Sequence, residues 1–345
     1  MSLYYQRNQG NDSYPSLYSN FTPIGGSDWS FSTSVGCLDP NTTIFRKSHA
    51  EGGRLIPRCT DYDVFLETTM KFNNTHVFDF PDKCLSRVID KFCTDHLLVP
   101  NIVHYVWFGG REFDFIYFVS FYSVFKFQKP CFMFLYYDVL PFGVWWDLLQ
   151  TLVNNIVFVK LTPPTQISGK KIIYVQHKSD IMRLKILKEY GGIYLDTDQY
   201  ILRSVNEFRN KECTMDRGPD GGVANAVIFA AKNATFINIW IDSYRDYYPN
   251  KWGKNSVKMA RNLSLKYPQY IHVYEVNCIF FPGESVLYNG NYKWSHSFAI
   301  HFFNKDYYYF SKKLGKLNPN TIKNLNNTIG AVFRYILYGN KELCK

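Results

Sequence analysis

The stretch of sequence that most constrains the fold is residues 178–200, which read KSDIMRLKILKEYGGIYLDTDQY. It places a helix-like run, a Gly-Gly pair, three strand-forming residues and two aspartates in immediate succession. Helices and strands that alternate in this way are typical of α/β proteins, and the strand ends of such sheets open onto the crevice that holds ligands. The two aspartates, Asp196 and Asp198, are therefore predicted to lie at a ligand site.

The helical part of this stretch is expected to carry polar residues near its N-terminus. Ser179 or Asp180 is expected to cap the helix, and Gly191 to end it in the left-handed conformation. Asp180 and Arg183 are three residues apart, so they share one face of the helix. Such a pair can grip the hydroxyls of a sugar, or it can be a surface ion pair of little structural weight. The pair alone leaves both interpretations open.

Asp196 and Asp198 are two residues apart in an extended segment, so their carboxylates face the same way. Carboxylates in this arrangement can bind Mg²⁺ or Mn²⁺ together with the phosphates of a substrate. The spacing alone is weak evidence, because Asp61 and Asp63 repeat it in a cysteine-bearing segment where we expect no metal. The helix, the Gly-Gly pair and the strand that precede Asp196 distinguish its site.

Composition and charge narrow the class of protein. The chain has 345 residues, of which 46% are hydrophobic and 18% aromatic, which is enough to bury a large core. The net charge is +10, but Lys and Arg are scattered through the chain, which argues against a nucleic-acid-binding arm. A mildly positive field favours the approach of an anionic nucleotide.

Cysteines and glycosylation sequons indicate a secretory protein. The eight cysteines include no C-x-x-C pair, which fits dispersed disulfides whose pairing the sequence does not assign. Seven N-x-S/T sequons point the same way; they start at Asn11, Asn20, Asn41, Asn73, Asn233, Asn262 and Asn326. The longest uncharged apolar run, residues 115–125, is about half as long as a membrane-spanning helix. With no signal peptide visible at Met1, we expect membrane contact only through an anchor outside this chain.

The chain divides into two parts. Residues 1–95 are rich in turns and hold four cysteines, so they are expected to be a loop-rich, stem-like extension with disulfides, packed on a main domain of residues 96–345. In the main domain, strands are predicted at 101–108, 131–137, 156–161, 193–195, 226–231 and 271–276, and helices around 115–122, 145–153, 179–190 and 236–247. This alternation predicts an α/β fold with a mainly parallel sheet.

The motif around the two aspartates resembles that of a known family. The string S-D-x-x-R-x-x-x-L-x-x-Y-G-G-x-Y-x-D-x-D, complete from Ser179 to Asp198, resembles the signature of retaining glycosyltransferases of the D-x-D sugar-binding type. These include α-1,4-galactosyl- and α-1,4-N-acetylglucosaminyltransferases, initiating α-1,6-mannosyltransferases and glucosylating toxins. A second block, residues 102–110, resembles the family's first strand and turn. The resemblance covers about residues 97–305 and implies a GT-A fold with a Rossmann-like sheet flanked by helices.

The resemblance also implies roles for individual residues. Trp107 would stack on the nucleotide base, unless it is a core residue. Ser179, Asp180 and Arg183 would lie at the donor sugar. Asp198 would bind the metal ion directly, and Asp196 would bind the metal ion or the ribose; both follow the order of the family's motif.

Three further residues are expected near the reacting groups. His301 lies in a late segment, residues 297–304, that resembles the family's A-x-H-x-x-N motif, and it would reach the metal or the diphosphate. The match departs from the family at Phe303, where a Trp is frequent. Asn225 would bond to the transferred sugar. Asp220 is a weaker candidate that would face the reaction centre, and a solvated Pro-Asp-Gly turn is the favoured interpretation of this position.

Taken together, these features predict a Mn²⁺- or Mg²⁺-dependent retaining glycosyltransferase that uses a nucleotide sugar, by preference a UDP-sugar. Its acceptor would be a glycan, a glycolipid or a glycoprotein, and its compartment the Golgi lumen or the exterior of the cell. Retention by front-face attack needs no enzyme nucleophile, so none is expected. Two alternatives stay open, namely a GDP-mannose-dependent α-mannosyltransferase and a nucleotide- or carbohydrate-binding protein that has the fold without turnover.

Overall fold

A computed structural model of the chain describes residues 78–218, 221–274, 287–288, 292, 294–303 and 316–339, together with four short strands between residues 54 and 70. These strands form two antiparallel pairs, β1 (Arg54–Leu55) with β4 (Thr69–Met70) and β2 (Arg58–Thr60) with β3 (Val64–Leu66). The second Asp-x-Asp sequence, at 61–63, lies outside the described residues.

The centre of the molecule is an eight-stranded sheet in the order β15-β13-β14-β11-β6-β7-β8-β5. Its strands are β15 (His272–Tyr274), β13 (Cys213–Arg217), β14 (Val223–Ala230), β11 (Gly192–Leu195), β6 (Ile102–Trp107), β7 (Phe132–Tyr137), β8 (Ile156–Lys160) and β5 (Phe78–Asp79). Only β14 runs antiparallel to its neighbours, and every other pairing is parallel. The predicted α/β class with a mainly parallel sheet is therefore confirmed.

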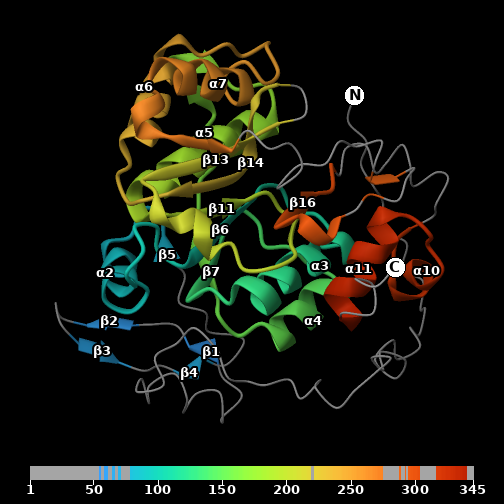
Figure 1. The fold of residues 1–345 in the computed structure, drawn as a ribbon. Coiled ribbons are helices and arrows are strands. Elements are labelled where there is room, and N and C mark those ends of the chain that lie inside the picture. Colours follow the sequence, from blue (N-terminus) through green and yellow to red (C-terminus); the bar gives the residue numbers. More distant parts are fainter. Residues whose placement is uncertain are drawn as a thin grey trace, which may run out of the picture.

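Helices cover both faces of the sheet (Figure 1). One face packs against α2 (Lys83–Phe92), α5 (Val175–Tyr190), α6 (Thr235–Ser243) and α7 (Val257–Lys266), and the other against α3 (Phe115–Ser123), α4 (Val144–Leu152) and α11 (Thr328–Tyr338). Strand β6 shows why two cores form. Val103 and Tyr105 join the core of α3, whereas Ile102 and Val106 join that of α5, because side chains alternate between the faces of a strand.

A small second sheet holds the chain just after the paired aspartates. It consists of β12 (Gln199–Ile201) and β16 (Ala299–His301), which are antiparallel. Helix α3 anchors β12 with two buried hydroxyls, since Ser120 donates to the carbonyl of Gln199 at 2.6 Å and Ser123 accepts from the amide of Ile201 at 2.9 Å. These bonds fix the strand that directly follows the paired aspartates.

The remaining elements are short. They are the hairpin β9 (Gln166–Ile167) and β10 (Lys170–Lys171), the π-helix η2 (Val124–Gln128), the 3₁₀ turns η3 (Asn206–Asn210), η4 (Tyr244–Asp246), η5 (Pro268–Tyr270) and η6 (Trp294–His296), and α10 (Pro319–Lys323). The hairpin lies where the sequence predicts only a loop. The strand predicted at 271–276 is described only to Tyr274. No helix among the described segments is long and apolar enough to cross a bilayer.

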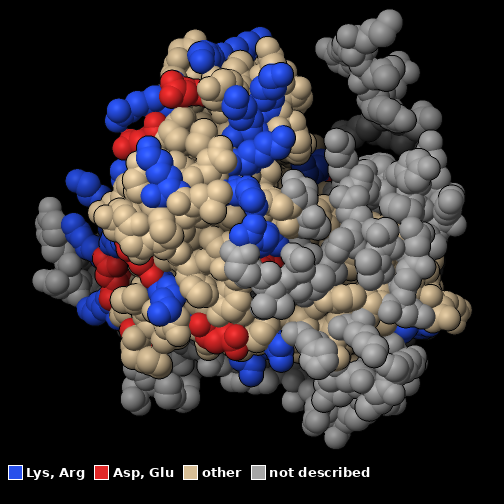
Figure 2. Space-filling model, turned by 45° about the horizontal axis from the view of Figure 1, so that its top comes forward, with Lys and Arg blue, Asp and Glu red and all other residues tan. Residues whose placement is uncertain are grey.

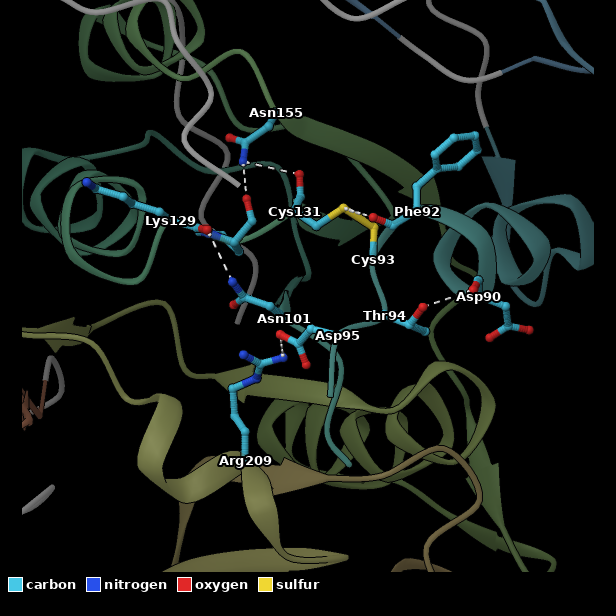
Figure 3. Close-up of a disulfide and its surroundings, with 11 residues drawn as sticks. Asp90, Phe92, Cys93, Thr94, Asp95, Asn101, Lys129, Cys131, Asn155 and Arg209 are labelled. Carbon is cyan, nitrogen blue, oxygen red and sulfur yellow. Dashed lines mark hydrogen bonds and ion pairs between the residues drawn. A yellow bond between two sulfur atoms is a disulfide. The ribbon is translucent and has the colours of Figure 1, made fainter. Parts of the chain in front are cut away.

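The segment before residue 95 contains more regular structure than the sequence predicts. Helix α2 packs Leu85, Val88 and Ile89 into the core, and the disulfide Cys93–Cys131 ties its end to the start of β7, with 5.5 Å between the Cα atoms (Figure 3). Four further cysteines, Cys37, Cys59, Cys278 and Cys344, lie where side chains are not described. The division of the chain at residues 95 and 96 stays a prediction.

Candidate functional site

The turn between α5 and β11 admits only glycine. Gly191 has φ 66° and ψ −165°, so its φ is positive as expected, but its ψ is that of a glycine-only extended conformation, not of a left-handed helix. A Cβ on Gly192, at φ 105°, would lie 2.6 Å from the Ile102 side chain and 2.8 Å from His104. The close approach lets β11 enter the sheet directly from the helix, which brings Asp196 to the end of β11.

Helix α5 begins earlier than the sequence predicts. Its N-cap is Tyr174, so Ser179 and Asp180 lie in the second turn, and the prediction that one of them caps the helix is wrong. Tyr174 is the last extended residue (φ −96°, ψ 132°), and Val175 begins the helix. Ser179 and Asp180 therefore face the interior of the site instead of the helix end.

Asp180 and Arg183 form a buried pair, not a surface one. Nη2 of Arg183 lies 3.1 Å from Oδ1 of Asp180, and the two side chains are only 5% and 10% exposed. Nη1 of Arg183 also contacts Asp196 at 3.2 Å and donates to the carbonyl oxygen of Asn225 at 2.6 Å. The amide of Asn225 donates to Asp180 at 2.9 Å. The guanidinium is thus held in one orientation, which a buried ion pair requires in order to be stable.

Burial changes the acidity of this network. Loss of hydration raises the pKa of Asp180 to about 6, although Arg183 opposes the shift. Tyr194 lies under the guanidinium, with Cζ of Arg183 4.5 Å from its ring centroid, and its hydroxyl donates to Asp196 at 2.8 Å. Tyr194 belongs to the motif from Ser179 to Asp198, and this contact assigns it the task of orienting the first aspartate.

Asp196, Asp198 and His301 form a possible metal site. One ligand atom of each lies within 4.8 Å of the others. The pairing of β12 with β16 brings them together, because His301 is the register partner of Gln199, the residue after Asp198. Nε2 of His301 lies 3.2 Å from Oδ1 of Asp198, and both side chains are mostly buried. Two carboxylates and an imidazole are a donor set that suits Mn²⁺, so the residues fit the expected metal.

Two opposing effects act on the pKa of the His301 imidazole. Burial lowers its pKa, but the carboxylates of Asp198 and Asp196 raise it, and the net direction is upward. A carboxylate pair that draws a proton onto a neighbouring imidazole offers the same attraction to a metal cation. The three side chains therefore form a local concentration of negative charge that favours cation binding.

Two of these side chains, those of Asp196 and Asp198, line a cavity of about 620 Å³. Its lining includes the predicted residues Ser179, Arg183, Asp196 and Asp198, together with Val106, Phe108, Arg111, Tyr117, Val175, Gln176, Tyr194 and Thr197. Arg111 and Tyr117 line the cavity but are not predicted as site residues from the sequence. Arg111 directly follows the Gly-Gly turn after β6, and that position at a strand end is the signal that could have indicated it.

Trp107 is covered in this structure. Its side chain is fully buried among Phe113 and Tyr117, and Cζ of Arg111 lies 4.0 Å from its ring centroid. The cavity wall at this point is Arg111 and not the indole. A nucleotide base can stack on Trp107 only if the guanidinium of Arg111 moves away from the indole ring. The role of Trp107 in base stacking therefore stays a prediction.

The two remaining predicted residues have different outcomes. Asn225 lies on β14 and contacts both Asp180 and Arg183, and its bond to the transferred sugar stays a prediction. Asp220 lies outside the described residues. The structure thus brings together Asp180, Arg183, Asp196, Asp198, Asn225 and His301 from α5, the turn before β12, β14 and β16.

Comparison with known proteins identifies the class. Residues 122–215 match the family described as "Glycosyltransferase sugar-binding region containing DXD motif", and the matched part includes both site aspartates. This part of the chain therefore carries the family's sugar-binding region, and the chain is a glycosyltransferase, as the resemblance of its motifs implies. Its mainly parallel sheet with helices on both faces agrees with the GT-A architecture that the resemblance implies.

Individual relatives can also be named. Glucan organizing enzyme 1 of Cryptococcus neoformans var. grubii is 28% identical over 264 residues, which are 69% of this chain and 70% of that protein. An uncharacterized glycosyltransferase of Acanthamoeba polyphaga mimivirus is 31% identical over 113 residues, 32% of this chain and 40% of that protein. Among solved structures, the glycosyltransferase GlyE of Streptococcus pneumoniae is 10% identical, with 70% of this chain and 60% of that chain covered and a TM-score of 0.43.

Proposed function

We propose that this glycosyltransferase moves a sugar from a nucleotide sugar, by preference a UDP-sugar, to an acceptor hydroxyl with retention at the anomeric carbon, and that it needs Mn²⁺ or Mg²⁺. The observation that carries the proposal is that Arg183, Asp196 and Asp198 line one cavity, where His301 contacts Asp198 and Asp180 pairs with Arg183. The carboxylates that would hold the metal ion and the diphosphate therefore lie beside the guanidinium and the carboxylate that would bind the sugar.

The residues of the chain have separate tasks in this reaction. Asp198, Asp196 and His301 would hold the divalent ion, which when bound stabilises the charge that builds on the departing diphosphate. Arg183 and Asp180 offer donors and acceptors to the hydroxyls of the donor sugar, and their mutual bonds keep them preorganised. In front-face attack the acceptor hydroxyl passes its proton to the departing phosphate oxygen, so the chain supplies no nucleophile.

The test is calorimetry of UDP and GDP with and without Mn²⁺, on wild type and on Asp198→Ala. We expect Mn²⁺-supported UDP binding by the wild type and its loss in Asp198→Ala, along with the loss of sugar transfer and no change in thermal stability. Asp63→Ala is the matched control, since it removes an aspartate from the other Asp-x-Asp sequence. Undiminished transfer by Asp198→Ala would refute the metal site.

The same experiment separates the alternatives. Metal-supported binding of GDP in preference to UDP would indicate a GDP-mannose-dependent enzyme. Binding of nucleotides without hydrolysis or transfer of any common nucleotide sugar would indicate a binding protein. Asp220 is tested alongside as Asp220→Asn, which lowers transfer only if that residue faces the reaction centre.

We further propose a secretory compartment, the Golgi lumen or the exterior, with a glycan, glycolipid or glycoprotein as acceptor. The exposure of the sequon residues Asn233, Asn262 and Asn326 supports it, as does the disulfide Cys93–Cys131. The corresponding check is loss of mass when the protein from a eukaryotic host is treated with an endoglycosidase. The loss should be smaller after Asn262→Gln and Asn326→Gln substitution.

A further inference from the structure

An exposed apolar patch lies beside the mouth of the cavity. Five large hydrophobic side chains are exposed there, those of Ile173, Tyr174, Val175, Tyr248 and Trp252, and Ile173 and Trp252 are 58% and 55% exposed. The rings of Tyr174 and Trp252 meet at 5.9 Å and 86°. Val175 also lines the cavity, so the patch and the cavity share an edge. Exposed hydrophobic groups gathered in this way mark sites of interaction.

The patch is presented by a well-fixed backbone. Asn255 closes the loop that carries Trp252, because its Oδ1 accepts from the amide of Tyr248 and its Nδ2 donates to the carbonyl of Tyr248, both at 2.9 Å. The indole of Trp240 donates to the carbonyl of Asn255 at 3.0 Å. Under Trp252, the buried ring of His177 stacks at 6.2 Å and is oriented by the hydroxyl of Tyr247 at 2.8 Å. The exposed indole is therefore supported from below.

Lysines surround these hydrophobic side chains, and acidic residues are missing from the same segments. Lys170, Lys171, Lys251 and Lys254 are exposed, and the Nζ atoms of Lys254 and Lys170 lie 3.8 Å and 6.0 Å from the centroid of the Tyr248 ring. Residues 162–179 and 247–274 contain no Asp or Glu. Figure 2 shows Lys and Arg side chains gathered over the α6 and α7 end of the molecule. The surroundings of the patch are thus strongly positive.

We propose that these nine side chains form a membrane-docking patch that binds a lipid surface carrying anionic headgroups. Trp and Tyr favour the interface between lipid and water, exposed aliphatic side chains enter its apolar edge, and lysines bind the negative headgroups. A site for a soluble glycan would offer carboxylates to the sugar hydroxyls, and the two segments that form the patch have none. The docking patch would turn the cavity mouth toward the membrane, which suits a lipid-linked acceptor. The choice of a lipid-linked acceptor rests on the proposed function, whereas membrane docking does not.

The test is flotation of the chain with phosphatidylcholine vesicles that contain or lack phosphatidylglycerol. We expect the wild type to float with the anionic vesicles alone. Two double variants, Ile173→Ser with Trp252→Ser and Lys251→Glu with Lys254→Glu, should each bind at least about tenfold more weakly. The matched control changes Leu265→Ser and Lys266→Glu, an exposed hydrophobic and basic pair on α7 outside the patch, and should bind as the wild type does.

Donor hydrolysis without vesicles is measured on the same preparations, so that failure of the proposed function and failure of docking are told apart. Unchanged hydrolysis and unchanged thermal unfolding in the variants, with flotation lost, support the docking patch. A wild type that does not float with anionic vesicles overturns it, and so does an equal loss in the control. A third outcome also counts against the docking patch and points to a glycan site. In that outcome free manno- or gluco-oligosaccharides change the tryptophan fluorescence of the wild type but not of the Trp252 variant, and no protein floats with the vesicles.

Discussion

Arg183 and Asn225 are joined by a hydrogen bond of 2.6 Å from Nη1 of the guanidinium to the main-chain carbonyl oxygen, so the central cation of the site is fixed to β14. The side chain of Asn225 completes a ring of contacts by donating to Asp180, the ion-pair partner of Arg183. A helix and an antiparallel strand thereby hold the proposed sugar-binding groups as one unit, which preorganises them before any substrate arrives.

We expect substitutions of Asp180 and of Arg183 to have different effects on the stability of the protein. Asp180→Asn keeps the shape and removes a carboxylate that is costly to bury, so we expect the free energy of unfolding to change by less than about 1 kcal/mol while transfer falls about 100-fold or more. Arg183→Ala leaves Asp180 and Asp196 without their shared cation and should cost about 3–5 kcal/mol of stability. Urea unfolding and transfer rates measure both. Comparable destabilisation by the two variants would contradict the network.

His301 should act on metal affinity and leave the fold intact. His301→Ala removes one of three ligand side chains, so we expect Mn²⁺ to bind about 10–100-fold more weakly and excess Mn²⁺ to restore part of the transfer activity. Equilibrium dialysis gives the affinity. His272→Ala is the control, because that histidine is exposed on β15. Equal effects of the two substitutions on Mn²⁺ binding would remove His301 from the site.

Gly192 should tolerate no side chain. Gly192→Ala combines a positive φ of 105° with contacts of 2.6 Å to Ile102 and 2.8 Å to His104, so we expect a loss of roughly 3 kcal/mol or more. Gly169→Ala provides the comparison, since it has a positive φ of 74° but no heavy atom within 4 Å. It should show only the backbone strain of roughly 1 kcal/mol. Chemical denaturation measures the difference, and equal losses would rule out the steric clash.

The pH dependence of stability should report on His104. Burial lowers the pKa of its imidazole to about 4, although a hydrogen bond to the carbonyl of Gly191 opposes the shift. The unfolded chain binds a proton near pH 6.5, whereas the folded chain resists it, so stability is full above that pH and falls as pH drops toward 4. Between pH 7.5 and pH 5 we expect a loss of about 2 kcal/mol from this group.

His104→Gln is the variant that isolates the effect. Gln keeps an amide donor for the carbonyl of Gly191 but does not titrate, so its free energy of unfolding should fall less between pH 7.5 and pH 5 than that of the wild type. Urea unfolding at the two pH values measures the difference. An identical pH dependence in both proteins would show that His104 is not the group responsible.

Part of this structure could be predicted because it depends on neighbours in the sequence. The strands that became β6, β7 and β8 are continuous apolar runs bounded by Gly, Pro or Asp, as expected for buried parallel strands. Local patterns were less reliable at ends of elements. The start of α5 was misplaced because Ser179 and Asp180 satisfy the rules for a cap, while their side chains are used by tertiary contacts instead. Helix α2 was missed because cysteines and turn residues around it resemble a loop.

The order of the main helices and strands between residues 101 and 247, the Gly-Gly turn and the spacing of the site motif follow from the sequence alone, since these depend on backbone conformation and on residues a few positions apart. Three features became visible only in the folded protein: the burial of the Asp180–Arg183 pair, the contact of His301 with Asp198 across β12 and β16, and the cover of Trp107 by Arg111. The packing of distant elements joins His301 to Asp198 and buries the other two pairs. The energy of such contacts depends on burial and on partners, which no local pattern contains.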